Sequence, residues 1–221
     1  MKRTKLSERT LPNYSQAEEI MNMVTHILGG ILGILVFILC PIRCYRNPLA
    51  FIASLIYGLS MTVLYTFSSI YHGLRPGMAK KVLQVIDHCS IYFLISGTYT
   101  PILLCAFLPS YPGIAWGLLG IQWGLCGIAT TLTAIDLRKY RVVSMICYIA
   151  MGWSIILFLP QTLTVMTKSG FIWLLAGGIA YTVGAILYGI GSKARWFHSV
   201  FHIFVVVGSL LQFIAIYLYA M

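Results

Sequence analysis

The chain has 221 residues, of which 59% are hydrophobic and only 9% charged, and its mean hydropathy is +0.88. A water-soluble domain needs a charged surface over its core, so this composition excludes a soluble globular protein and indicates an all-α integral membrane protein. The net charge of +10 resides in segments between apolar runs, where basic residues suit anionic lipid headgroups, and we expect no nucleic-acid partner.

A basic leader, residues 1–19, precedes a membrane domain that covers residues 20–221. Seven apolar runs in this domain are long enough to cross a hydrocarbon core about 30 Å thick, which takes roughly 20 helical residues. The predicted spans cover residues 20–40, 48–72, 82–107, 113–135, 142–160, 171–191 and 196–219. The sequence therefore predicts a bundle of seven transmembrane helices.

Lys and Arg are distributed unevenly among the segments outside these spans. The leader and every second loop hold twelve of the 15, whereas the other loops hold only Arg43, Arg46 and Lys168. The twelve are Lys2, Arg3, Lys5, Arg9, Arg75, Lys80, Lys81, Arg138, Lys139, Arg141, Lys193 and Arg195. Because cytoplasmic segments carry the excess of these residues, we predict a cytoplasmic N-terminus and an outside C-terminus.

The fourth predicted span carries glycines at small-xxx-small spacing, which lets helices approach closely. They are Gly113, Gly117, Gly120 and Gly124. The pattern favours packing within the bundle, with homodimerisation as the alternative.

All five histidines fall near the predicted cytoplasmic ends of spans. They are His26, His72, His88, His198 and His202, and the same layer contains Asp87, Glu19 and Asn22. Ionisable residues are costly at membrane depth and are functional candidates there. Their gathering at one depth predicts a single site.

His198 and His202 are four residues apart and therefore project from one helix face. His72, from another span, can supply a third imidazole. Three histidines leave a fourth tetrahedral position for water, which is the pattern of a catalytic zinc site. The bound metal is therefore predicted to be Zn2+, although imidazole also suits iron, copper and nickel.

Two further polar residues accompany these histidines, Asp87 at the same depth and Ser68 deeper in the bilayer. Ser68 precedes His72 by one helical turn, and Asp87 lies near the start of the third predicted span. A carboxylate beside a zinc-bound water can orient it or accept its proton, and a hydroxyl can hold either group. The alternatives are that Asp87 caps its helix and that the Ser68 hydroxyl bonds the preceding turn.

Four motifs stand in order along the chain: EEIMNMVTHILGG, SSIYH, DHCSIYFLISGTYTP and HSVFH. Together they resemble the signature of the hemolysin III family, the bacterial branch of the progestin and adipoQ receptor superfamily. The resemblance implies a seven-helix protein of the bacterial cytoplasmic membrane with a zinc ion near the cytoplasmic face. It implies the zinc ligands His72, His198 and His202, with Asp87 and Ser68 flanking the bound water.

The resemblance also assigns a polar network to the first span, made of Glu19, Asn22, Thr25 and His26, which braces the site. His88 departs from the receptor branch of the superfamily, so the resemblance assigns it no role beyond this network.

A membrane-embedded zinc ion with one water position suits hydrolysis of a lipid amide or ester, and in this respect the receptor branch resembles alkaline ceramidases. Our main hypothesis is a zinc-dependent lipid hydrolase, or a lipid-responsive regulator of membrane homeostasis, that holds a membrane lipid in the bundle interior. One alternative is a non-enzymatic receptor or regulator with structural zinc. The other is a pore-forming cytolysin, against which the confinement of ionisable residues to one face argues.

Overall fold

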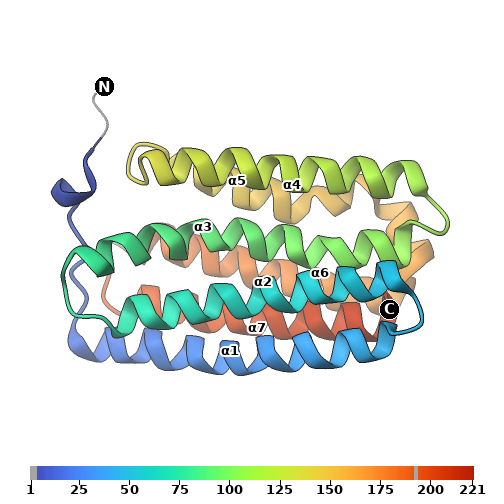
Figure 1. Cartoon of the computed structure of the whole chain (residues 1–221), viewed down its shortest axis with the longest axis horizontal. Coiled ribbons are helices and arrows are strands. Elements are labelled where there is room, and N and C mark those ends of the chain that lie inside the picture. Colours follow the sequence, from blue (N-terminus) through green and yellow to red (C-terminus); the bar gives the residue numbers. More distant parts are fainter. Residues whose placement is uncertain (1–3, 192–193) are drawn as a thin grey trace.

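The computed structural model of the chain describes residues 4–191 and 194–221, and these residues form an all-helical bundle (Figure 1). The long helices are α1 (Gln16–Cys44), α2 (Pro48–Gly73), α3 (Met78–Pro101), α4 (Pro112–Ile135), α5 (Arg141–Trp153), α6 (Leu159–Gly191) and α7 (Phe197–Tyr219). Shorter helical segments are η1 (Leu6–Glu8), η2 (Ile102–Phe107) and η3 (Ser154–Phe158). The predicted all-α fold is confirmed, while Lys2, Arg3 and Lys193, counted in the charge bias, lie outside the described residues.

Six helical stretches among the described residues are long and apolar enough to cross a membrane. Five of them contain the first four predicted spans and most of the last. The remaining stretch, Arg141–Ile190, has 50 residues and takes in α5, η3 and nearly all of α6. A protein with several membrane spans is thus supported, and the count of seven stays a prediction.

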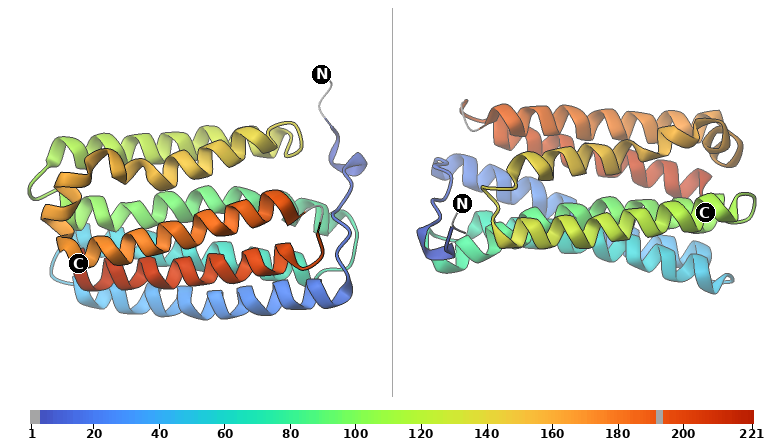
Figure 2. Two further views of the ribbon diagram at one scale, coloured as in Figure 1. Left: turned by 180° about the vertical axis from the view of Figure 1, so that it is seen from behind. Right: turned by 90° about the horizontal axis from the view of Figure 1, so that it is seen from above.

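The stretch Arg141–Ile190 is not one straight helix. Thr167 has a left-handed backbone, with φ 61° and ψ 166°, and interrupts α6 with a kink. Beyond the kink, Gly170 lies against Tyr219, close to the C-terminus. The chain reverses in this region, and α6 then returns beside α7 (Figure 2).

One end of the bundle, called here the leader end, is where the leader (residues 4–15) crosses the loops between helices (Figure 1). Three hydrogen bonds fasten this end: Lys81 Nζ to Ser7 O (2.6 Å), Thr4 N to Asp136 Oδ2 (2.9 Å) and Trp196 N to Glu18 Oε1 (2.8 Å). The α2–α3, α4–α5 and α6–α7 connections, which the charge bias places on one side, therefore share an end. The C-terminus lies at the opposite end.

Close packing by glycine occurs between α1 and α2. A Cβ atom added at Gly58 would lie 2.4 Å from Cα of Phe37, so only glycine permits this approach. In contrast, a Cβ atom at any of the four α4 glycines, Gly113, Gly117, Gly120 and Gly124, would meet no described atom within 4 Å. The predicted packing of these glycines within the bundle is wrong, because they border open space.

Candidate metal centre

Three histidines meet at the leader end of the bundle. His72 belongs to the last turn of α2, and His198 and His202 to the first two turns of α7. All three are buried, and one nitrogen of each lies within 4.8 Å of the others. Nε2 of His198 and Nε2 of His202 are 3.1 Å apart. Two nitrogens bound to one tetrahedral zinc ion would be about 3.3 Å apart, so this spacing suits a shared metal.

The surroundings of His72 leave one of its nitrogens free for a metal. Nδ1 of His72 lies 2.6 Å from Oε2 of Glu19 and 3.4 Å from Nδ2 of Asn22. Nε2 of His72 is buried and has no hydrogen-bond partner. A buried polar atom without a partner is costly, whereas a metal-ligating histidine commonly donates its other N–H to a carboxylate. His72 therefore has the arrangement of a ligand.

Lys80 extends this chain of contacts, although its place in the sequence indicated only a charge that sets the topology. Its side chain is buried, and Nζ donates to Oε1 of Glu19 (2.7 Å) and to the carbonyl of Leu74 (2.9 Å). Glu19 thus joins an ammonium to the imidazole of His72. No pattern in the sequence pairs residues 19 and 80, because the contact depends on how α1 packs beside the α2–α3 turn.

His26 lies against His202 without belonging to the group of three candidate ligands. Its ring stacks on His202 with 3.7 Å between centroids, and both of its nitrogens are buried without a hydrogen-bond partner. Thr25 turns away from the cluster and donates to the carbonyls of Met21 and Asn22 on its own helix. The structure therefore brings Glu19, Asn22 and His26 to the histidines, and leaves Thr25 bonded within α1.

Asp87 and Ser68 line one cavity together with His26, His198 and His202. Ser68 is fully buried and its Oγ has no hydrogen-bond partner, so the alternative of a bond to the preceding turn is wrong. Asp87 Oδ2 lies 3.6 Å from Nδ1 of His88. The alternative that Asp87 caps its helix is also wrong, because α3 begins at Met78, about two and a half turns earlier.

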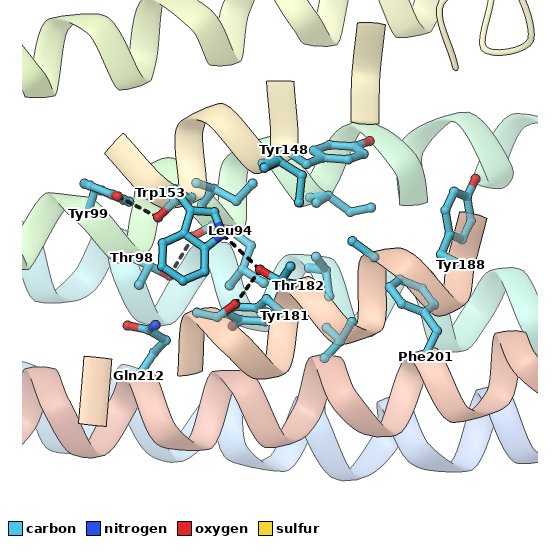
Figure 3. A pocket seen from close by; sticks show the side chains of 18 of the residues that line it. Leu94, Thr98, Tyr99, Tyr148, Trp153, Tyr181, Thr182, Tyr188, Phe201 and Gln212 are labelled. Atoms are coloured by element: carbon cyan, nitrogen blue, oxygen red, sulfur yellow. Dashed lines mark hydrogen bonds between the residues drawn. The ribbon is translucent and has the colours of Figure 1, made fainter. Parts of the chain in front are cut away.

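The cavity that these residues share is called here the apolar cavity, and it has a volume of about 170 Å³. It extends from the histidines between α3, α5, α6 and α7, and most of its wall is aliphatic or aromatic (Figure 3). Labelled residues of this wall include Leu94, Tyr148, Trp153 and Phe201. The one polar group of the Trp153 side chain, its Nε1–H, donates to Oγ1 of Thr182 at 2.9 Å. An apolar chain is the ligand that such a wall suits.

Both nitrogens of His88 bond to protein groups. Nδ1 lies 2.8 Å from the carbonyl of Gln84, and Nε2 lies 3.0 Å from the hydroxyl of Tyr188. Because a carbonyl only accepts, Nδ1 carries the proton and Nε2 accepts from Tyr188. His88 is therefore a hydrogen-bonding neighbour of the site, and it fixes Tyr188 on the α6 wall.

Tyr14 of the leader covers the cluster from the loop side. Its ring stacks on that of His198, with 4.7 Å between centroids and 14° between planes. Burial, followed by the nearby Tyr188, raises the pKa of the Tyr14 phenol above its ordinary value, so it stays protonated. Tyr14 was not among the predicted site residues, because no local pattern marks a leader tyrosine as part of a site.

The chain is similar to known proteins along nearly the whole helical bundle. The family described as "Haemolysin-III related" matches residues 14–213. Hemolysin-3 of Bacillus cereus is 37% identical over 206 residues, which cover 92% of each chain. A hemolysin-3 homolog of Bacillus subtilis (strain 168) is 34% identical over 209 residues, covering 91% of this chain and 94% of that one. The human monocyte to macrophage differentiation factor is 25% identical over 213 residues, covering 91% and 84%.

Proposed function

We propose that this chain, which belongs to the haemolysin III-related family, is a membrane-embedded zinc hydrolase that cleaves an amide or ester bond of a lipid. His72, His198 and His202 would hold the zinc ion, since three imidazoles are a common ligand set of catalytic zinc. One observation carries the proposal: two of these histidines share the apolar cavity with the unpartnered hydroxyl of Ser68 and the carboxylate of Asp87.

When bound, zinc supplies a Lewis acid that polarises a carbonyl and lowers the pKa of water. Glu19 holds Nδ1 of His72 and keeps Nε2 turned to the other histidines. Asp87 accepts a proton from the attacking water and returns it to the leaving group. Ser68 donates its hydroxyl hydrogen to the water or to this carboxylate. The apolar cavity holds the acyl chain and excludes bulk water from the bond that is cleaved.

We further propose that the chain spans a bacterial inner membrane seven times and that its leader lies on the cytoplasmic side. A straight helix of 50 residues would be about 75 Å long, more than twice the hydrocarbon thickness, so Arg141–Ile190 suits two crossings that meet near Thr167. The basic loops share the leader end, which supports its cytoplasmic placement. Alkaline phosphatase fused after Met221 should be active and green fluorescent protein dark; the opposite pattern would overturn this orientation.

Metal analysis of the detergent-purified chain tests the zinc site. The wild type should hold about one zinc ion per chain, and the double variant His198→Ala, His202→Ala should hold almost none. His88→Ala is the matched control, since both His88 nitrogens already bond to Gln84 and Tyr188, and it should keep its zinc. A wild type without stoichiometric metal would sink the proposal.

Hydrolysis is tested on the same preparations with acyl-labelled ceramides and glycerolipids in mixed micelles. The zinc-loaded wild type should release fatty acid, and Asp87→Ala should keep zinc but lose release. If the wild type holds zinc and releases nothing from any of these lipids, the function is instead that of a non-enzymatic regulator in which zinc ties α2 to α7.

A further inference from the structure

A second cavity, of about 750 Å³, lies at the leader end on the loop side of the histidines. Four arginines line it, each from a different part of the fold, and we call it the arginine cavity. They are Arg9 of the leader, Arg138 of the α4–α5 connection, Arg141 at the start of α5 and Arg195 before α7. Hydroxyl and amide side chains add further donors, including Tyr14, Tyr71 and Gln84.

Arg9 shows that this wall has unused donors. Its Nη2 donates to the carbonyl of Ile135 at 3.1 Å, but its Nε and Nη1 are shielded from solvent and have no hydrogen-bond partner. Each of these two N–H groups belongs to a guanidinium and can form a charge-assisted hydrogen bond to a phosphate or carboxylate oxygen. A preference of basic residues for one membrane side accounts for the charge of Arg9, but not for guanidinium N–H groups that are shielded from solvent and have no protein partner.

The carboxylates of the arginine cavity do not use these donors. Oε1 of Glu18 accepts from the Trp196 N–H, and its Oε2 accepts from the N–H and hydroxyl of Ser15. Glu8 is exposed on the leader. Four guanidiniums against two carboxylates leave a net positive wall, and the Glu18 charge is already bound by protein donors. An anion is therefore the ligand that balances this cavity.

The two cavities meet at three residues, because His88, Tyr188 and His198 line both. An amphiphile that places its anionic group among the arginines and its chain in the apolar cavity would pass its linking bonds beside His198. We propose that the arginine cavity binds the phosphate group of such an amphiphile, and that phosphate-bearing acyl lipids are the substrate class. The assignment as substrate rests on the proposed hydrolase function, whereas the phosphate site itself requires neither zinc nor turnover.

Binding to the full-length chain in a neutral detergent tests the proposal, with calorimetry as the readout. The probes are dioctanoyl phosphatidic acid, dioctanoylglycerol with the same chains and no phosphate, and inorganic phosphate. Phosphatidic acid should bind at least about tenfold more tightly than either of the others, since it alone reaches both cavities. If dioctanoylglycerol binds as tightly as phosphatidic acid, the arginines do not recognise the phosphate group, and the proposal is overturned.

The double variant Arg9→Gln, Arg141→Gln should lose about tenfold or more in affinity for phosphatidic acid and keep its affinity for dioctanoylglycerol. Arg43→Gln, Arg46→Gln removes the same charge at the opposite end and is the matched control. If the glutamine variant does not fold, Arg9→Lys, Arg141→Lys keeps the charge without the planar fork, and it should still bind phosphatidic acid more weakly than the wild type. An equal loss in the control pair would mean general charge attraction and would refute a site.

Two further measurements distinguish a lipid phosphate from free phosphate, and phosphate binding from the proposed hydrolase function. Inorganic phosphate that binds as tightly as phosphatidic acid would identify a free-phosphate site and overturn the amphiphile. His72→Ala removes a candidate zinc ligand that is not among the residues lining either cavity, and it should bind phosphatidic acid like the wild type. Binding that persists there while zinc is lost keeps this proposal separate from the hydrolase; binding lost together with zinc would refute an independent phosphate site.

Discussion

Oε2 of Glu19 lies 2.6 Å from Nδ1 of His72, and this contact decides which nitrogen of His72 faces the α7 histidines. With Nδ1 held, Nε2 is the free atom, and it is buried without another partner. The other carboxylate oxygen of Glu19 accepts from Lys80 at 2.7 Å, which compensates the partly buried negative charge. A carboxylate of the first long helix thereby orients a candidate metal ligand of the second.

Glu19→Gln should weaken zinc binding by about 10- to 100-fold, because the amide is neutral and holds the imidazole less firmly. Competition with a chelator of known affinity measures the change on purified protein. Glu8→Gln makes the same chemical change on the exposed leader segment η1 and should leave the affinity unaltered. Unchanged zinc affinity in Glu19→Gln would show that the carboxylate does not support the ligand.

Asp87→Asn should retain zinc and lower the rate of lipid hydrolysis by roughly 10²- to 10⁴-fold, the range over which proton transfer by a positioned side chain acts. Asparagine keeps the shape of the side chain in the apolar cavity but cannot accept the proton. Metal content and turnover are measured on the same sample. Parallel loss of both would assign Asp87 to structure rather than to proton transfer.

Glu18→Ala should lower the melting temperature of the purified protein, since it removes the acceptor for the Trp196 N–H and the capping box with Ser15. Bonds to a charged group contribute about 1.5–3 kcal/mol each. Trp196 has a left-handed backbone, φ 68°, directly before α7, so loss of this bond should also loosen His198. Glu8→Ala is the exposed control, and a similar melting shift there would count against the role of Glu18.

Gly58→Ala should destabilise the bundle by about 1–3 kcal/mol, because the added Cβ would lie 2.4 Å from Cα of Phe37 and force α1 from α2. Gly120→Ala, in open space on α4, should leave the melting temperature unchanged or raise it, because alanine favours helix. Thermal unfolding in detergent compares the pair. A destabilised Gly120→Ala would point instead to a contact of the α4 face with a second chain.

Acid should release the leader from the α4–α5 connection. Backbone N–H groups of Thr4 and Lys139, followed by Arg138, lower the pKa of Asp136 to about 2. Because this folded value lies below the unfolded value of about 3.9, the ionised carboxylate stabilises docking above pH 4, and that stability is lost as the pH falls toward 2. Pepsin, active at both pH values, should cleave the leader readily at pH 2 and slowly at pH 4.

Asp136→Asn provides the comparison for this prediction. Its leader should already be cleaved quickly at pH 4, with a smaller change on going to pH 2. If the wild type and the variant respond to pH alike, other carboxylates govern the release, and the Asp136 contacts do not hold the leader.

Hydropathy alone determined that the chain is a helical membrane domain and located five of its apolar runs to within a few residues, because the thickness of the bilayer sets the length of each run. The charge bias predicted that His72, His198 and His202 lie at one depth in the membrane. The four-residue spacing predicted that His198 and His202 share one helix face. The site motifs were therefore readable from local pattern, with membrane depth as the only long-range information.

Only the tertiary structure decided which groups touch. Glu19 and Lys80 are 61 positions apart, and Tyr14 reaches His198 from the leader, so neither contact leaves a periodic trace in the sequence. The α4 glycines had a packing spacing but border open space, because spacing describes one helix and packing requires a second. The same holds for the arginine cavity. In the sequence its four arginines indicated only the orientation of the chain in the membrane, whereas in the fold they line one cavity beside the histidines.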